Sequence, residues 1–254
     1  MVAAPFELAW RGGATEARLH RRRPGSEALP WGTLAAAVRA YDPTELLAAR
    51  AAWSGGVFTE YASAAAFSAL TTAMLECGAP VDLVAASADI AVDELFHVEL
   101  SARVVMELGG AAPIAFDLAN IAPVAQLTRP IARAAEIAIV TSCVGESLSV
   151  PAIARSRVLA RDPLVRGVLD RLLADEGPHA RLGFWFLDWA AAQLTDDERA
   201  ALATIATDAL AVYADLWRDD DDADLRAAVE HAIAAPLARY GIVLPPDRVA
   251  AHVA

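Results

Sequence analysis

Apolar residues recur at helical spacing through most of the chain, in long stretches that glycine and proline interrupt. Alanine and other good helix formers fill these stretches without a break. The pattern predicts an all-α protein with one core domain and extensions. Its four main helices are expected at Pro43 to about Cys77, Pro80 to Leu108, Pro130 to Ala160 and Asp162 to about Leu194.

The segments around these helices define the expected domain organisation. Residues 1–43, rich in arginine, glycine and proline, are predicted to form an N-terminal arm that packs on the core. Residues 44–194 would be a four-helix bundle, and residues 111–128 form a connection long enough to cross from one end of it to the other. Residues 195–254 read as a C-terminal helical extension that opens with the capping sequence Thr195 to Glu198.

Composition and net charge argue against some classes of binding partner. The formal net charge of -12 argues against a nucleic-acid-binding surface, which needs clustered basic residues. The two cysteines, Cys77 and Cys143, have no zinc or disulfide-scaffold spacing, which favours a reduced, cytoplasmic setting. The most apolar window, residues 137–154, contains Glu146 and Pro151 and therefore suits a buried bundle helix better than a membrane span. We expect neither a nucleic acid nor a membrane as partner.

The motif Asp-Glu-x-x-His occurs twice, at residues 93–97 and 175–179. Residues three apart on an α-helix project from one face, so the glutamate and histidine of each copy can bind the same metal ion. A single such pair is more often a surface feature. Two copies on successive long helices indicate a metal site, whose candidate ligands here are Glu94, His97, Glu176 and His179.

An isolated glutamate precedes each copy of the motif. Glu60 is the only charged residue between Arg50 and Glu76, and Glu146 has a similar apolar setting. A carboxylate on such a stretch is expensive to bury without compensation. Four buried glutamates would carry about four negative charges, which two divalent cations would neutralise.

The sequence therefore predicts six ligands for two metal ions. Oxygen donors with a few nitrogens suit iron or manganese, whereas structural zinc usually takes thiolates and imidazoles. We expect two iron ions, with manganese or a mixed Fe/Mn pair as the open alternative. One ion would be bound by Glu60, Glu94 and His97, and the other by Glu146, Glu176 and His179.

With these residues, the chain resembles the ferritin-like superfamily of di-iron carboxylate proteins, whose four helices carry Glu, ExxH, Glu and ExxH in that order. The resemblance covers roughly residues 44–192. It implies a ferritin-like bundle with a long crossover between its second and third helices, and it implies that the six ligands are also the catalytic residues. The DExxH form is similar to that of the oxidases and oxygenases of the superfamily. This implies a non-haem di-iron oxidoreductase that activates O2 to oxidise a small organic substrate, with an external electron donor and a homodimer as expected partners.

A bacterioferritin-like ferroxidase or iron-storage protein is the alternative, because bacterioferritin has the same six ligands. The N-terminal arm and the C-terminal extension favour the enzyme. Small residues near the ligands could either leave room for a substrate or allow close helix packing. Both interpretations stay open for Gly56, Ser63, Ala64, Ser142, Gly145 and Ser149.

The second motif differs from the first because it contains Gly177-Pro178. Proline inside a helix removes a backbone donor and crowds the carbonyl group four residues earlier. We therefore predict a kink or a π-bulge in the fourth helix at the metals.

Overall fold

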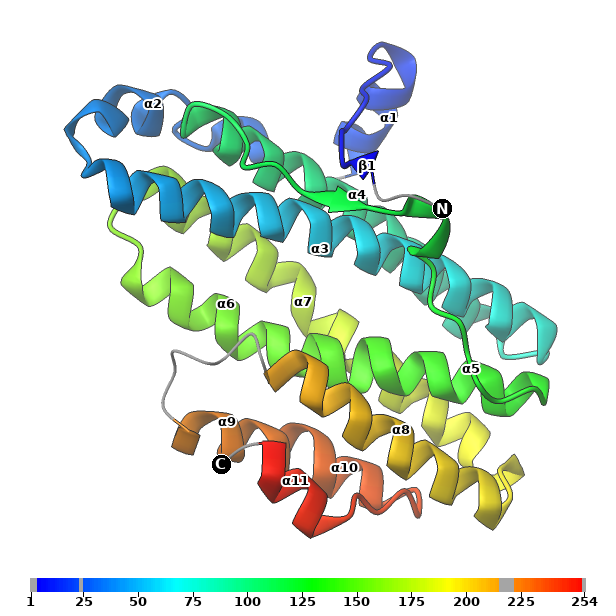
Figure 1. Ribbon diagram of the computed structural model, residues 1–254. Helices are drawn as coiled ribbons and strands as arrows, with labels where there is room; N and C mark the ends of the chain where they lie inside the picture. The colour runs from blue at the N-terminus through cyan, green and yellow to red at the C-terminus, as the bar shows by residue number, and fades with distance from the viewer. Residues whose placement is uncertain (1–3, 23–24, 215–221, 253–254) are drawn as a thin grey trace. The chain divides into compact units, whose positions relative to one another are not determined.

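A computed structural model describes residues 4–22, 25–214 and 222–252 (Figure 1). Helices account for most of these residues, and the strands within this part of the chain are one antiparallel pair of two residues each, β1 (Ala4–Pro5) and β2 (Ala115–Phe116). The prediction of an all-α protein is confirmed.

The long helices begin and end close to their predicted limits. Asp42 caps the first of them, because its Oδ1 accepts hydrogen bonds from the amides of Thr44 at 2.8 Å and Glu45 at 3.3 Å. These two bonds lower the pKa of Asp42. The helices are α3 (Pro43–Glu76), α4 (Val81–Glu107), α5 (Pro130–Ala138), the π-helical segment η4 (Ile139–Glu146), α6 (Ser147–Leu159) and α7 (Pro163–Ala190), which the 3-10 turn η5 (Ala191–Gln193) follows.

The π-helical distortion lies in a different helix from the one predicted. The prediction for this helix was a kink or a π-bulge. Helix α7 is α-helical from Pro163 to Ala190 with Pro178 inside it, so the π-bulge is wrong and the kink stays a prediction. The π-helical turns occur instead in η4, whose last residue is Glu146. Such turns are often found at functional sites.

The chain divides into two compact units, each composed of several segments. The first unit comprises Met1–Ala66, Asp89–Ala122 and Ser156–Leu172. The second unit comprises Phe67–Ala88, Pro123–Arg155 and Leu173–Ala254. Helices α3, α4, α6 and α7 contribute to both.

In the first unit, the N-terminal segment packs against α3 and α4. The ring of Phe6 contacts Phe58 and Tyr61 of α3, with centroids 5.3 Å apart in both pairs. Val57 and Val98 belong to the buried apolar cluster at this contact. The shorter elements of the unit are α1 (Ala14–Arg22), η1 (Ser26–Ala28), α2 (Thr33–Ala37), η2 (Val38–Ala40) and η3 (Leu118–Asn120).

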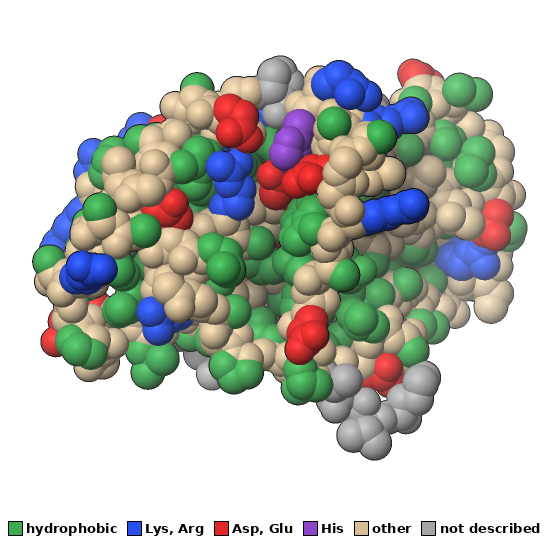
Figure 2. All heavy atoms as spheres, turned by 90° about the horizontal axis from the view of Figure 1, so that it is seen from above, with side chains coloured by type: hydrophobic (Ala, Val, Ile, Leu, Met, Phe, Trp, Pro, Cys, Tyr) green, Lys and Arg blue, Asp and Glu red, His purple; other side chains and the backbone are tan. Residues whose placement is uncertain are grey.

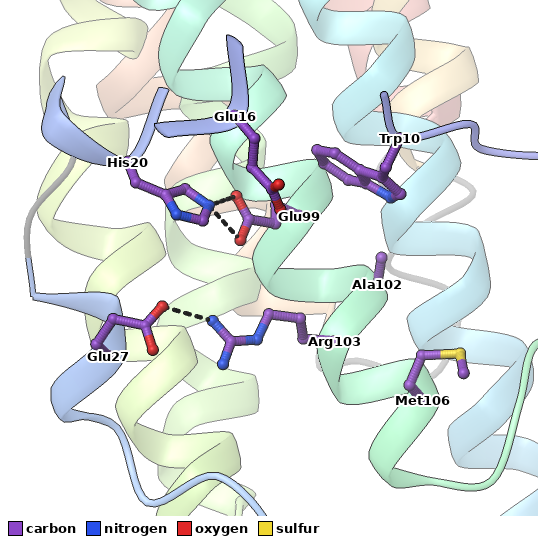
Figure 3. A pocket seen from close by; sticks show the side chains of 8 residues that line it. All are labelled: Trp10, Glu16, His20, Glu27, Glu99, Ala102, Arg103 and Met106. Carbon is purple, nitrogen blue, oxygen red and sulfur yellow. Dashed lines mark hydrogen bonds and ion pairs between the residues drawn. The ribbon is translucent and has the colours of Figure 1, made fainter. Parts of the chain in front are cut away.

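Polar contacts tie the N-terminal elements to α4. His20 Nε2 lies 2.7 and 2.8 Å from the two carboxylate oxygens of the buried Glu99, and Arg103 pairs with Glu27 at 3.3 Å (Figure 3). These side chains line a cavity of about 350 Å³, with Trp10 beside it. In the space-filling view, a histidine lies among acidic and basic side chains next to apolar ones (Figure 2).

In the second unit, the C-terminal helices gather around α8 (Asp196–Ala214), which contacts α5, η4 and α11 (Figure 1). A reciprocal capping box begins α8, as the sequence indicated: the Glu198 amide donates to Thr195 Oγ1 at 3.2 Å, and the Thr195 amide donates to Glu198 Oε2 at 2.8 Å. The remaining elements are α9 (Asp222–Ala228), the π-helical η7 (Val229–Ala234), α10 (Ala235–Ala238) and α11 (Pro246–His252).

The apolar stretch Pro130–Leu159 is, by length and composition, the one candidate membrane span among the described residues. Its most apolar window is 61% buried inside the protein. This burial agrees with the interpretation of the stretch as a core helix.

Candidate metal centre

Each compact unit holds three of the six predicted ligands. In the first unit these are Glu60, Glu94 and His97, here called the first cluster. In the second unit they are Glu146, Glu176 and His179, the second cluster.

The first cluster brings two carboxylates to one imidazole. His97 Nδ1 lies 3.6 Å from Glu60 Oε2 and 3.6 Å from Glu94 Oε2. The His97 and Glu94 side chains are 0% and 1% exposed, and that of Glu60 is 15% exposed. One ligand atom from each of the three residues lies within 4.8 Å of the others. This buried cluster of glutamate and histidine side chains could hold a metal ion.

Local sequence explains why α4 presents its motif to the interior. The side chains that surround the motif on the helix, including Phe96, Val98 and Leu100, are 2% exposed or less. Leu95, within the motif, is 41% exposed, so α4 has an exposed side here as well as a buried one. The spacing of three brings Glu94 and His97 to the same, buried face.

In the second cluster, Glu176 and His179 form the equivalent pair on α7. His179 Nδ1 lies 3.1 Å from Glu176 Oε2, and both side chains are 1% exposed. The ring of Phe67 lies beside the imidazole, with centroids 5.9 Å apart. Glu146 is also buried, at the end of η4. In both copies the histidine Nδ1 therefore faces the glutamate Oε2, at 3.6 Å in the first and at 3.1 Å, a hydrogen-bond distance, in the second.

Tyr213 of α8 is a neighbour of Glu146 that the sequence did not reveal. Burial raises the pKa of Tyr213 to about 12, and the nearby Glu146 carboxylate adds to the rise. The phenol also lies against Gly145, where an added Cβ would be 2.8 Å from the Tyr213 hydroxyl oxygen. The four-helix ligand pattern gives no signal for this residue, because α8 follows the bundle in sequence.

The structure distinguishes between two of the small residues near the ligands. At Gly145 the Tyr213 ring occupies the space that a side chain would need, so this glycine serves close packing. At Gly56, one turn before Glu60, a Cβ would meet nothing within 4 Å. Gly56 is therefore the position that leaves open space.

The donor types fit a hard divalent metal ion. Each cluster offers two carboxylates and one imidazole, and Cys143, the cysteine next to Ser142, is fully buried with its thiol pKa raised well above the usual value by burial. A thiol that stays protonated is a poor metal ligand. The carboxylates and imidazoles are therefore the candidate ligands, and Cys143 is not among them.

No family model, curated protein or solved structure matches this chain. The functional assignment accordingly depends on the residues and their geometry.

Proposed function

We propose that the chain is a ferritin-like di-iron oxidoreductase that activates O2 to oxidise a small organic substrate. The observation that carries the proposal is the first cluster, in which Glu60, Glu94 and His97 from two helices converge in the protein interior. The same ExxH pair on α7 supports a second ion. In this proposal, each cluster binds one iron ion.

The number of carboxylates supports metal ions that change oxidation state, and iron is the one we propose. Four glutamates supply about four negative charges, more than one divalent ion needs. Glutamate can bind through one or both oxygens, which lets a centre adjust its coordination as the oxidation state of the metal changes. Bound iron would supply the one-electron chemistry that O2 requires. A Lewis-acid role would not require all four carboxylates, and manganese or a mixed pair would use the same donors.

The protein's own residues would bind and orient the metal and exclude water. Each histidine is held within 3.6 Å of a glutamate of its own motif, which fixes the side on which its ring presents a nitrogen. The apolar side chains around Glu94 and Glu176 keep bulk water away from the carboxylates. Insertion of one oxygen atom into a substrate consumes two further electrons, so the proposal includes an external electron donor. A homodimer and a cytoplasmic location remain predictions.

Anaerobic reconstitution with ferrous iron tests the proposal. We expect about two iron ions per chain in the wild type and about one in each of the variants His97→Ala and His179→Ala. Oxygen consumption after addition of a reductant should fall at least tenfold in both variants. His231→Ala changes an exposed histidine of η7 and serves as the matched control, with wild-type iron content and oxygen uptake. Fewer than one iron ion per wild-type chain would overturn the proposal.

Titration with excess ferrous iron in air separates the oxygenase from the ferroxidase alternative. An oxygenase should stop at about two iron ions per chain, and its oxygen uptake should need a reductant and respond to organic substrates. Continued oxidation of ferrous iron, with a growing ferric core, would assign the protein to iron storage instead.

A further inference from the structure

The hydroxyl of Ser142 lies between two consecutive turns of α7 at the second cluster. Ser142 Oγ donates a hydrogen bond to the carbonyl oxygen of His179 at 2.5 Å, and it accepts one from the amide of Gly183 at 2.8 Å. In a regular α-helix, the amide of residue 183 donates to the carbonyl of residue 179. The serine hydroxyl therefore contacts both backbone groups of one helical hydrogen-bond pair.

Two local features bring Ser142 into this position. Ser142 belongs to the π-helical segment η4, whose wider turns change the direction of the side chains they carry. The facing residue on α7 is Gly183, and a Cβ there would lie 2.5 Å from Cys143 Sγ and 2.8 Å from the carbonyl oxygen of Ala138. The absence of a side chain at Gly183 thus permits the close approach that the serine bridge needs.

The bridge contacts the backbone of His179, which is a predicted metal ligand. His179 is 1% exposed, and its imidazole is already in contact with Glu176 of the same helix. The two hydrogen bonds of Ser142 hold this turn of α7 against η4. The backbone of His179, and with it the direction of the imidazole, therefore depends on a hydrogen bond from another helical segment.

We propose that Ser142 is a positioning residue, which orients His179 for metal binding by bridging the His179 carbonyl and the Gly183 amide. This inference rests on the proposed function only in requiring that the second cluster binds a metal. Ser142→Ala would remove both contacts and leave the His179 backbone free to shift relative to η4. Loss of a group that hydrogen-bonds a metal-bound imidazole typically costs about tenfold to hundredfold in metal affinity, and we expect a similar cost for this backbone contact.

Titration of the metal-free protein with cobalt(II), followed by visible absorption, tests the inference. The variants His97→Ala and His179→Ala identify which binding phase belongs to which cluster. In Ser142→Ala, the phase assigned to the second cluster should weaken at least tenfold with a changed cobalt spectrum, and the first phase should keep its affinity. Thr207→Ala is the matched control, because it removes another buried hydroxyl that donates a hydrogen bond to a helix carbonyl in the second unit, that of Ala203, at 2.7 Å.

A second readout uses no metal. Nitrogen NMR signals of the imidazoles in the metal-free protein should shift for His179 and stay unchanged for His97 when Ser142 is replaced. Ser142→Cys, which nearly keeps the volume and a weak donor, should give an intermediate shift and affinity if Ser142→Ala does not fold. Unchanged cobalt affinity and unchanged His179 signals in the folded variants would overturn the role of Ser142. A wild type without cobalt binding would overturn the proposed function, while the metal-free spectra would still test the bridge.

Discussion

Gly183 has no side chain, and this permits α7 to lie close to η4. The backbone of α7 meets η4 at this residue, and an added Cβ would also lie 3.1 Å from Ser142 Cβ. We expect Gly183→Ala to lower the free energy of unfolding by about 1–3 kcal/mol, the usual cost of overpacking. Gly55→Ala is the control, since a Cβ there meets nothing within 4 Å, and it should stabilise by up to about 1 kcal/mol. Urea unfolding checks both, and a Gly183→Ala protein as stable as wild type would contradict the packing argument.

At the residue scale, the sequence predicted the candidate ligands, because these depend on the spacing of residues along a helix. The two motifs and their isolated glutamates identified the six candidate ligands, because helical periodicity is a local property. The contacts of Ser142 with Gly183 and of Tyr213 with Gly145 were not predicted. Each joins segments far apart in sequence, and the closeness of such segments is a result of tertiary packing.

At the element scale, helix limits were predictable where local side chains cap the helix. Asp42 begins α3 by accepting two amide hydrogen bonds, and Thr195 begins α8 by accepting one. The place of the π-helical turns was not predictable from proline alone. Pro178 removes one donor, whereas the turns of η4 coincide with residues that contact α7 and α8 closely.

Glu198 joins the start of α8 to the residue before α5. Its carboxylate accepts hydrogen bonds from Arg129 and from the Thr195 amide, and these, with Arg129 first, lower the pKa of Glu198 from 4.5 to about 2. A lowered pKa stabilises the fold above the unfolded-state pKa, and this contribution is lost as the pH falls toward 2. We expect Glu198→Gln to lower the melting temperature at pH 7, by an amount that shrinks between about pH 5 and pH 2. A difference that is constant over this range would contradict the assignment.

The N-terminus of α2 depends on a side chain from α4. Glu107 accepts hydrogen bonds from the amides of Gly32 at 2.7 Å and Ala35 at 2.8 Å, and so caps a helix whose N-cap residue is a glycine. In Glu107→Ala we expect these two amides to exchange with deuterium at least tenfold faster. Hydrogen-exchange mass spectrometry measures this, with Glu45→Ala, another glutamate of the first unit, as control. Unchanged exchange would show that α2 is held by its other contacts.

At the scale of the whole molecule, buried carboxylates in a chain of net charge -12 oppose folding unless a cation compensates them. Glu94 is 1% exposed, so Glu94→Gln should raise the melting temperature of the metal-free protein by removing a buried charge. The same change should remove most of the stabilisation by ferrous iron, which for one intact site is about 2.7 kcal/mol at a free ion concentration of one hundred times Kd. Glu45→Gln, at an exposed position of α3, should leave both quantities unchanged. Anaerobic thermal unfolding with and without iron measures them. If wild type and Glu94→Gln gained equal stability from iron, the charge of Glu94 would have a role other than metal binding.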